Sequence, residues 1–152
     1  MKIEDIRKWD KQEFWDIHKL IKDKENLSHH DFLRIRNFKS NLFSSEKEEN
    51  INKITKEAFK LANEDKIKEA IEKLLELHGV GVPIASAILS MKFPDKFAII
   101  DNRVIKRLGK NEWLKTYLFS PETYEKYLFL LREKIKENGF NLRDYERGLF
   151  EK

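Results

Sequence analysis

The sequence has no cysteine and few of the residues that interrupt regular structure. Its 152 residues include only five glycines and three prolines. Without cysteine, this chain cannot form disulfide bonds, thiolate-bound zinc sites or cysteine-ligated iron–sulfur clusters. The scarcity of glycine and proline argues against long disordered segments. We therefore expect a folded chain that fits a reducing compartment such as the cytoplasm.

Long hydrophobic runs are also missing. The longest stretch without a charged residue or histidine, residues 79–91, has 13 residues, whereas a membrane-spanning helix needs about 20. The first residues, Met1–Asp5, carry two acidic side chains and do not have the pattern of a secretory signal. The sequence therefore predicts a cytoplasmic protein that does not associate with a membrane.

Positive charge is in slight excess and is concentrated in one region. The net charge is +4, and residues 92–115 alone contain seven basic and three acidic side chains. Such a cluster is either an ordinary solvated surface or a patch that faces phosphate groups. The charge alone does not decide between these two interpretations.

The hydrophobic pattern is helical almost throughout. Apolar residues recur at steps of three and four, and no segment alternates as a strand would. We expect residues 1–152 to form a single all-α domain, a compact bundle of eight or nine helices. The expected helices lie within residues 6–21, 32–43, 51–61, 67–77, 84–91, 102–108, 121–138 and 142–150. The helix over 84–91 is apolar on almost every side and should be central and buried.

Several residues mark helix ends. Asn63 is expected to cap the helix that contains Ile67. Asp101 is expected to cap the helix over residues 102–108. Ser120 with Pro121 is a strong start signal, because proline is tolerated in a first turn. Asn138-Gly139 is a typical stop signal.

The segment Leu77–Leu89 contains the most informative motif. Gly79-Val80-Gly81 forms a tight turn, and an alanine-rich helix with Pro83 in its first turn follows without a gap. The backbone N–H groups of Gly81, Val82 and Ile84 would point toward a single phosphate, assisted by the helix dipole. A plain helix–helix turn is the alternative interpretation, since glycine commonly follows a helix end.

Asp101 stands directly after a short apolar run and begins a basic helix. Its carboxylate is either a helix cap or a catalytic group, and one residue can do both. Arg103, Lys106 and Arg107 follow within about one helical turn. These cations either contact phosphates or form a solvated face.

Together these features resemble the helix-hairpin-helix DNA glycosylases. That family has a Gly-x-Gly turn, a helix of small residues, a short apolar segment and then an aspartate, as residues 77–107 do here. Asp101 follows Pro83 by 18 residues, the interval seen in the family. The resemblance implies double-stranded DNA as partner, a target base rotated out of the stack, and Asp101 as the group that stabilises positive charge on the sugar and orients water.

The resemblance also implies what kind of glycosylase to expect. Bifunctional members carry a lysine where this chain has Pro83, so a monofunctional N-glycosidase without metal or cofactor is expected. Two other functions stay open. One is a non-catalytic nucleic-acid-binding protein in which Asp101 only caps a helix. The other is a helical interaction protein in which the glycine turn only reverses the chain.

Some residues outside the motif are weaker candidates. Tyr117, Tyr124 and Tyr127 are aromatic side chains able to stack on a base. Arg143, Asp144 and Glu146 are expected to form salt bridges on the last helix. The sequence does not indicate which base would be removed, whether DNA is preferred to RNA, or the oligomeric state.

Overall fold

The computed structural model describes residues 3–39, 46–114 and 119–151, and the regular elements in this part of the chain are all helices. The expected all-α fold is therefore confirmed. In chain order the elements are α1 (Ile3–Ile21), α2 (His29–Lys39), α3 (Glu48–Asn63), α4 (Ile67–Leu74), α5 (Val82–Lys92), α6 (Asn102–Arg107), the 3-10 helix η1 (Asn111–Leu114), α7 (Pro121–Asn138) and α8 (Leu142–Glu151). Among the described helices, none is both long and apolar enough to span a membrane.

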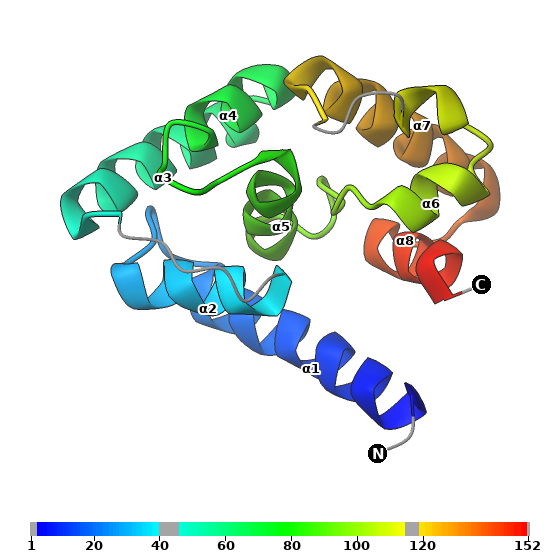
Figure 1. Ribbon diagram of the computed structural model, residues 1–152, viewed down its shortest axis with the longest axis horizontal. Coiled ribbons are helices and arrows are strands. Elements are labelled where there is room, and N and C mark those ends of the chain that lie inside the picture. Colours follow the sequence, from blue (N-terminus) through cyan, green and yellow to red (C-terminus); the bar gives the residue numbers. More distant parts are fainter. Residues whose placement is uncertain (1–2, 40–45, 115–118, 152) are drawn as a thin grey trace.

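Helix α5 lies at the centre of the fold (Figure 1). It packs against α1 and α2 on one side and against α4 on another, while α6, α7 and α8 form a further group. Every residue of α5 except Pro83 is buried. The apolar pattern of this helix had predicted a buried central position, and that prediction is confirmed.

The segment between α5 and α6 is buried although it forms no helix. Residues 97–100 are all buried, so their backbone polar groups need partners from elsewhere. The Tyr124 hydroxyl donates a hydrogen bond of 2.7 Å to the carbonyl of Ala98, and the Tyr127 hydroxyl one of 2.8 Å to Ile99. Both tyrosines are fully buried, so they do not stack on a base. Tyr117 lies outside the described residues.

Ser86 joins this buried segment to the first turn of α5. Its hydroxyl oxygen accepts a hydrogen bond of 3.0 Å from the N–H of Ile100 and donates one of 2.7 Å to the carbonyl of Pro83. A single side chain therefore sets the distance between the start of α5 and the residue that precedes Asp101.

Lys92, at the end of α5, stabilises the end of another helix. Its ammonium group donates to the carbonyls of Ile21 at 3.0 Å and Lys22 at 2.6 Å, and also to that of Lys24. These carbonyls lie at and just beyond the C-terminus of α1, where carbonyls lack helical partners and cations are favoured. Burial lowers the pKa of Lys92. Lys92 belongs to the basic region 92–115, but it is a structural residue rather than a phosphate contact.

The helix-end predictions are largely confirmed. Ser120 accepts a hydrogen bond from the N–H of Thr123 and precedes Pro121, and Gly139 ends α7 with a φ of 71°. The prediction for Asn63 is wrong. Helix α3 extends through Asn63, and the residue that precedes α4 is Lys66. The backbone N–H of Glu64 continues the helical bonding of α3, so Asn63 lies inside a helix rather than before one.

The expected second helix contained Leu42 and Phe43, which lie outside the described residues. Its described part, α2, begins with reciprocal bonds at its N-terminus. The N–H of Asp31 donates to the Ser28 hydroxyl, and the N–H of Ser28 donates to the Asp31 carboxylate, both at 3.1 Å. This is the capping-box arrangement, which satisfies two backbone donors at once.

We predict that Ser86→Ala destabilises the fold while Ser90→Ala does not. Both serines are fully buried on α5, but the Ser90 hydroxyl has no hydrogen-bond partner among the described residues. Leaving the N–H of Ile100 unpaired should cost about 1–3 kcal/mol. Urea unfolding of the two variants measures this difference. Equal losses would mean that Ser86 does not hold the segment before Asp101.

Candidate functional site

The hairpin segment between α4 and α5 contains the predicted turn, with Gly79 at positive φ and a helix that begins directly after Gly81, although α4 ends three residues before the expected Leu77. Helix α4 ends at Leu74, and α5 begins at Val82 directly after Gly81. Gly81 occupies the N-cap position in an extended conformation, with φ −100° and ψ −178°, and has no side chain to cap the helix. The first N–H groups of a helix have no partner within it. Those of Val82 and Ile84 in this turn are therefore suited to an external anion.

The two glycines of the hairpin are glycine for different reasons. Gly79 has a φ of +74°, and a Cβ atom there would lie 3.1 Å from Nη1 of Arg36. The fold therefore requires glycine at this position. A Cβ atom on Gly81 would meet only Cδ of Pro83, at the ordinary contact distance of 3.8 Å. No contact within the described part of the chain therefore requires glycine at position 81.

Arg36 of α2 contacts the hairpin from within the fold. Its guanidinium is buried, lies 5.9 Å from the centre of the Phe32 ring and donates a hydrogen bond to the carbonyl of Gly79. Burial lowers the pKa of Arg36. Sequence reasoning missed this residue, because 43 positions separate it from Gly79 and no local pattern links them.

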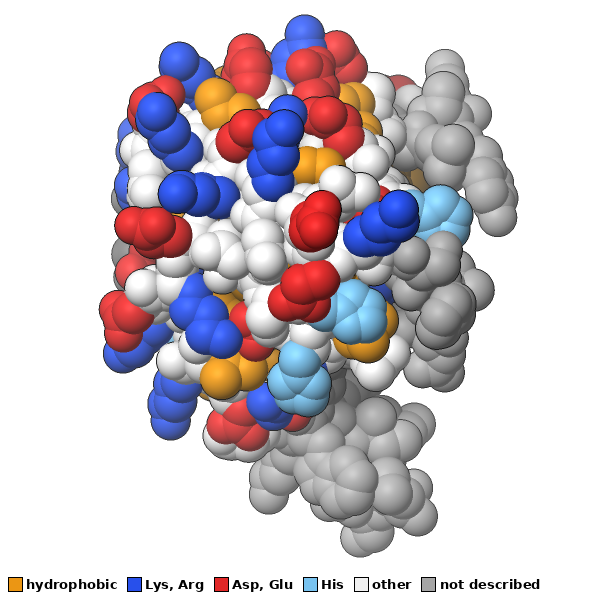
Figure 2. Space-filling model, turned by 90° about the vertical axis from the view of Figure 1, so that its left-hand side faces the viewer, with side chains coloured by type: hydrophobic (Ala, Val, Ile, Leu, Met, Phe, Trp, Pro, Cys, Tyr) orange, Lys and Arg blue, Asp and Glu red, His pale blue; other side chains and the backbone are white. Residues whose placement is uncertain are grey.

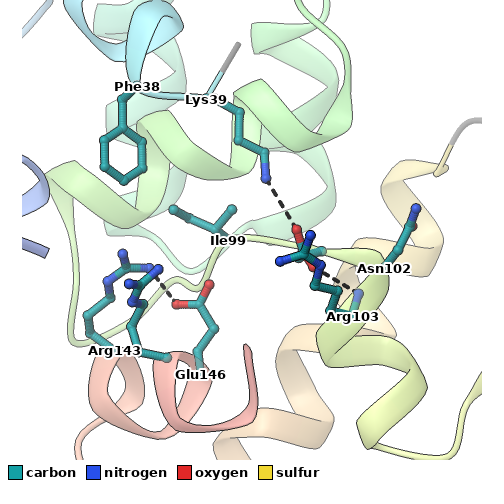
Figure 3. A pocket seen from close by; sticks show the side chains of 9 residues that line it. Phe38, Lys39, Ile99, Asn102, Arg103, Arg143 and Glu146 are labelled. Carbon is teal, nitrogen blue, oxygen red and sulfur yellow. Dashed lines mark hydrogen bonds and ion pairs between the residues drawn. The ribbon is translucent and has the colours of Figure 1, made fainter. Parts of the chain in front are cut away.

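Lys39, one turn further along α2, makes the corresponding contact with Asp101. Its ammonium nitrogen lies 3.7 Å from Oδ2 of the Asp101 carboxylate, as Figure 3 shows for the Lys39 side chain. Residues three apart on a helix are neighbours on its surface. Adjacent side chains of α2, Arg36 and Lys39, therefore contact the hairpin and Asp101, two parts of the motif that are far apart in sequence.

Asp101 is the N-cap of α6, as predicted. Its Oδ1 atom accepts a hydrogen bond of 2.8 Å from the N–H of Arg103. The side chain is 23% exposed, so it is accessible while both carboxylate oxygens have partners. The buried segment before it and the helix after it fix its position.

Asp101 lies in the wall of a cavity of about 360 Å³, at the small end of the range typical of small-molecule sites. Figure 3 shows side chains from α2, the start of α6 and α8 converging around Ile99. Four basic side chains and two carboxylates contribute, a surplus of positive charge. The lining residues are Phe38, Lys39, Ile99, Asp101, Asn102, Arg103, Arg143, Glu146 and Arg147.

Helix α8 supplies a buried ion pair to this wall. Nη1 of Arg143 lies 2.7 Å from Oε2 of Glu146, and both side chains are about 5% exposed or less. The Arg143 guanidinium also stacks 3.9 Å above the Phe14 ring. Burial raises the pKa of Glu146, against the effect of Arg143. A salt bridge on the last helix was predicted, but it lies in the cavity wall, while Asp144 is exposed and accepts a hydrogen bond from Asn141.

The basic residues of α6 divide into two groups. Arg103, Lys106 and Arg107 are all exposed, but only Arg103 lines the cavity. Nη1 of Arg107 donates a hydrogen bond of 3.2 Å to the carbonyl of Leu149 and so ties α6 to α8. None of the predicted hairpin residues, Gly79, Gly81, Val82 and Ile84, lines the cavity. The hairpin and the cavity are thus separate features linked through α2 and Ser86.

Sequence reasoning did not find the contributions of α2 and α8 to the cavity. Lys39, Arg143 and Arg147 are distant from Asp101 in sequence and have no motif of their own. One signal was present at Glu146, which lies four residues after Leu142 and three before Leu149. A carboxylate at that spacing falls on the apolar side of an amphipathic helix, where charged residues are uncommon.

A second cavity of about 680 Å³ lies between the end of α1 and α3. Of the ionisable residues that line it, only Lys92 is buried, and its ammonium group already donates to three carbonyls. Lys24 pairs with Asp31 and Lys56 with Glu25. Figure 2 shows basic and acidic side chains interspersed over the α3 side of the molecule. We therefore take the cavity at Asp101 as the candidate site.

A scan of the chain against protein-family models finds no match, and searches of curated proteins and of solved structures find none either. What this site does must therefore be inferred from its own geometry and chemistry.

We predict different effects for substitutions at the two hairpin glycines. Gly79→Ala should lose roughly 1–2 kcal/mol of unfolding free energy, because an L-residue is strained at positive φ and its Cβ would crowd Arg36. Gly81→Ser should leave stability unchanged or slightly higher, since serine is a favoured N-cap. Urea denaturation followed by circular dichroism checks both values. A large loss in Gly81→Ser would show that the fold itself requires glycine there.

Proposed function

We propose that this chain is a monofunctional DNA N-glycosidase that binds duplex DNA through the α4–α5 hairpin and uses the Asp101 carboxylate. The observation that carries the proposal is the pair of contacts from one turn of α2. Arg36 donates to the carbonyl of Gly79, while Lys39 pairs with Asp101. A candidate phosphate site and a carboxylate at a cavity are thereby held together, as an enzyme acting on a nucleotide in DNA requires.

The hairpin would hold the DNA backbone. The N–H groups of Gly81, Val82 and Ile84 would donate to one phosphate, with the α5 dipole favouring negative charge. Arg103, Lys106 and Arg107 are exposed on α6 and would contact phosphates beside the flipped nucleotide. Such contacts position a duplex without selecting its sequence.

Asp101 would act on the sugar of the flipped nucleotide. As the bond between C1′ and the base nitrogen breaks, positive charge develops on the sugar, and a fixed carboxylate stabilises it and orients water. Pro83 has no amine to form a Schiff base. We therefore propose base removal by hydrolysis alone.

A second candidate function is non-catalytic binding of nucleic acid. It is favoured by the partners of Asp101, since Oδ1 accepts from the N–H of Arg103 and Oδ2 faces Lys39. A carboxylate with both oxygens engaged is also what a purely structural helix cap would have.

Binding to a duplex with a cationic pyrrolidine abasic-site mimic separates these two functions. The mimic resembles the charged sugar of the transition state, and such analogues bind roughly 100-fold or more tighter than substrates. We expect a preference of that size over the unmodified duplex, lost in Asp101→Asn. Asparagine is an equally good N-cap, so the fold should persist. Equal, salt-sensitive affinity of the wild type for both duplexes would instead support the non-catalytic function.

The contribution of the hairpin is tested by Gly81→Asp. A carboxylate there would repel a phosphate, and a hydrogen bond to a charged group contributes about 1.5–3 kcal/mol. We expect affinity for modified and unmodified duplexes to fall about tenfold or more, by the same factor. The matched control is Gly148→Asp, which adds the same charge where a Cβ meets nothing within 4 Å. If both variants bind like the wild type, the hairpin is not the phosphate site.

A further inference from the structure

The charged side chains that line the cavity at Asp101 limit which bases this cavity can accept. We infer that the cavity takes a neutral base that leaves as an anion, that Arg143 stabilises the departing base, and that positively charged N-alkylated bases are disfavoured. This inference rests on the proposed N-glycosidase function and adds the class of substrate. It starts from the surplus of positive charge among the residues that line the cavity.

Arg143 is held rigidly in the cavity wall. Its guanidinium is clamped between Oε2 of Glu146 at 2.7 Å and the face of the Phe14 ring at 3.9 Å. The bond to Glu146 uses one of the five N–H donors of a guanidinium. The side chain is 4% exposed, and Figure 3 shows it beside Glu146 on α8, close to Ile99. A fixed, buried donor needs little reorganisation when charge develops.

Burying these charges is costly, and the core offers no reason for it. Arg143, Glu146 and Arg147 are all at most 9% exposed, and a buried ion pair is often no more stable than apolar residues of similar volume. Ionisable groups gathered in a cleft are more typical of functional sites. From the side of α2, Lys39 adds a further positive charge to the same space.

Breaking the glycosidic bond moves an electron pair onto the base. The bond between C1′ and the base nitrogen breaks, and its electrons stay with the nitrogen. Water then adds to C1′ and releases one proton, and a base that departs as an anion takes up one proton, whereas a base that departs neutral takes up none. A neutral base carries a negative charge at the transition state, which Arg143 stabilises. An N-alkylated purine is a cation that becomes neutral, so Arg143 would repel the substrate and gain nothing at the transition state.

The experiment compares base release from four duplexes that differ at one position. Three carry a neutral base (uracil, hypoxanthine or 8-oxoguanine), and the fourth carries cationic N7-methylguanine. Single-turnover rate constants are measured at subsaturating enzyme, so that they report the transition state relative to free enzyme and free DNA, and each is divided by the uncatalysed rate on the same duplex. We expect at least one neutral base to be released with an acceleration about 100-fold greater than that of N7-methylguanine, the scale of one lost catalytic donor.

Variants at Arg143 test its assignment. Arg143→Gln should lower release of the neutral base about 100-fold and leave N7-methylguanine unchanged or faster, while Arg143→Lys should restore part of the loss. The double variant Arg143→Gln with Glu146→Gln removes both buried charges and should show the same shift if the single variant folds poorly. Arg34→Gln is the matched control, since Arg34 pairs with Glu13 and does not line the cavity.

The outcomes separate this inference from the proposed function. Faster release of N7-methylguanine by the wild type, or equal losses on both substrate classes in Arg143→Gln, would overturn the inference and leave the N-glycosidase in place. If no duplex releases its base, the inference fails. The Asp101-dependent preference for the pyrrolidine duplex then decides separately whether the proposed function fails with it.

Discussion

The arrangement of the site depends on a segment that cannot satisfy its own backbone. Residues 97–100 are buried without helix or strand, and unpaired buried amide groups are costly. Tyr124, Tyr127 and Ser86 supply the missing partners. Because these come from two different helices, the segment has one position relative to both α5 and α7. Asp101 follows this segment directly, so the same hydrogen bonds fix its position.

Buried cations serve two distinct purposes in this fold. Lys92 and Arg36 donate to main-chain carbonyls, at the end of α1 and in the hairpin respectively. They replace hydrogen bonds that the backbone cannot make locally. Arg143 instead pairs with a side chain and borders a cavity. Lys92 also borders a cavity, so what distinguishes Arg143 is that its partner is the carboxylate of Glu146 rather than a main-chain carbonyl.

Features that depend on neighbouring residues could be predicted from the sequence, whereas contacts between distant segments could not. The caps at Asp101 and Ser120 and the stop at Gly139 depend on residues within a few positions of each other, so their chemistry is visible in the sequence. Asn63 failed because cap preference is weak compared with the continuation of α3.

The candidate site was only half visible for the same reason. The hairpin and Asp101 lie in one stretch of chain, so the spacing of the residues indicated them. The cavity needs Lys39 from α2 and Arg143 from α8, and only helix packing brings these together. Tyr124 and Tyr127 looked available for stacking because an aromatic residue in a helical pattern does not reveal what its hydroxyl will bind. Their partners, the carbonyls of Ala98 and Ile99, become evident only in the folded chain.

The last turn of α2 has a thermodynamic consequence. Because Arg36 and Lys39 project from the same rigid turn, a small rotation of that turn shifts the hairpin carbonyl and the Asp101 carboxylate together. A ligand that binds the hairpin better in one orientation of α2 must also favour one placement of Asp101. Under the proposed function, linkage requires that occupancy beside Asp101 changes the affinity of the hairpin for its ligand by the same factor. The two ends of the motif would then form a reciprocally coupled pair of sites.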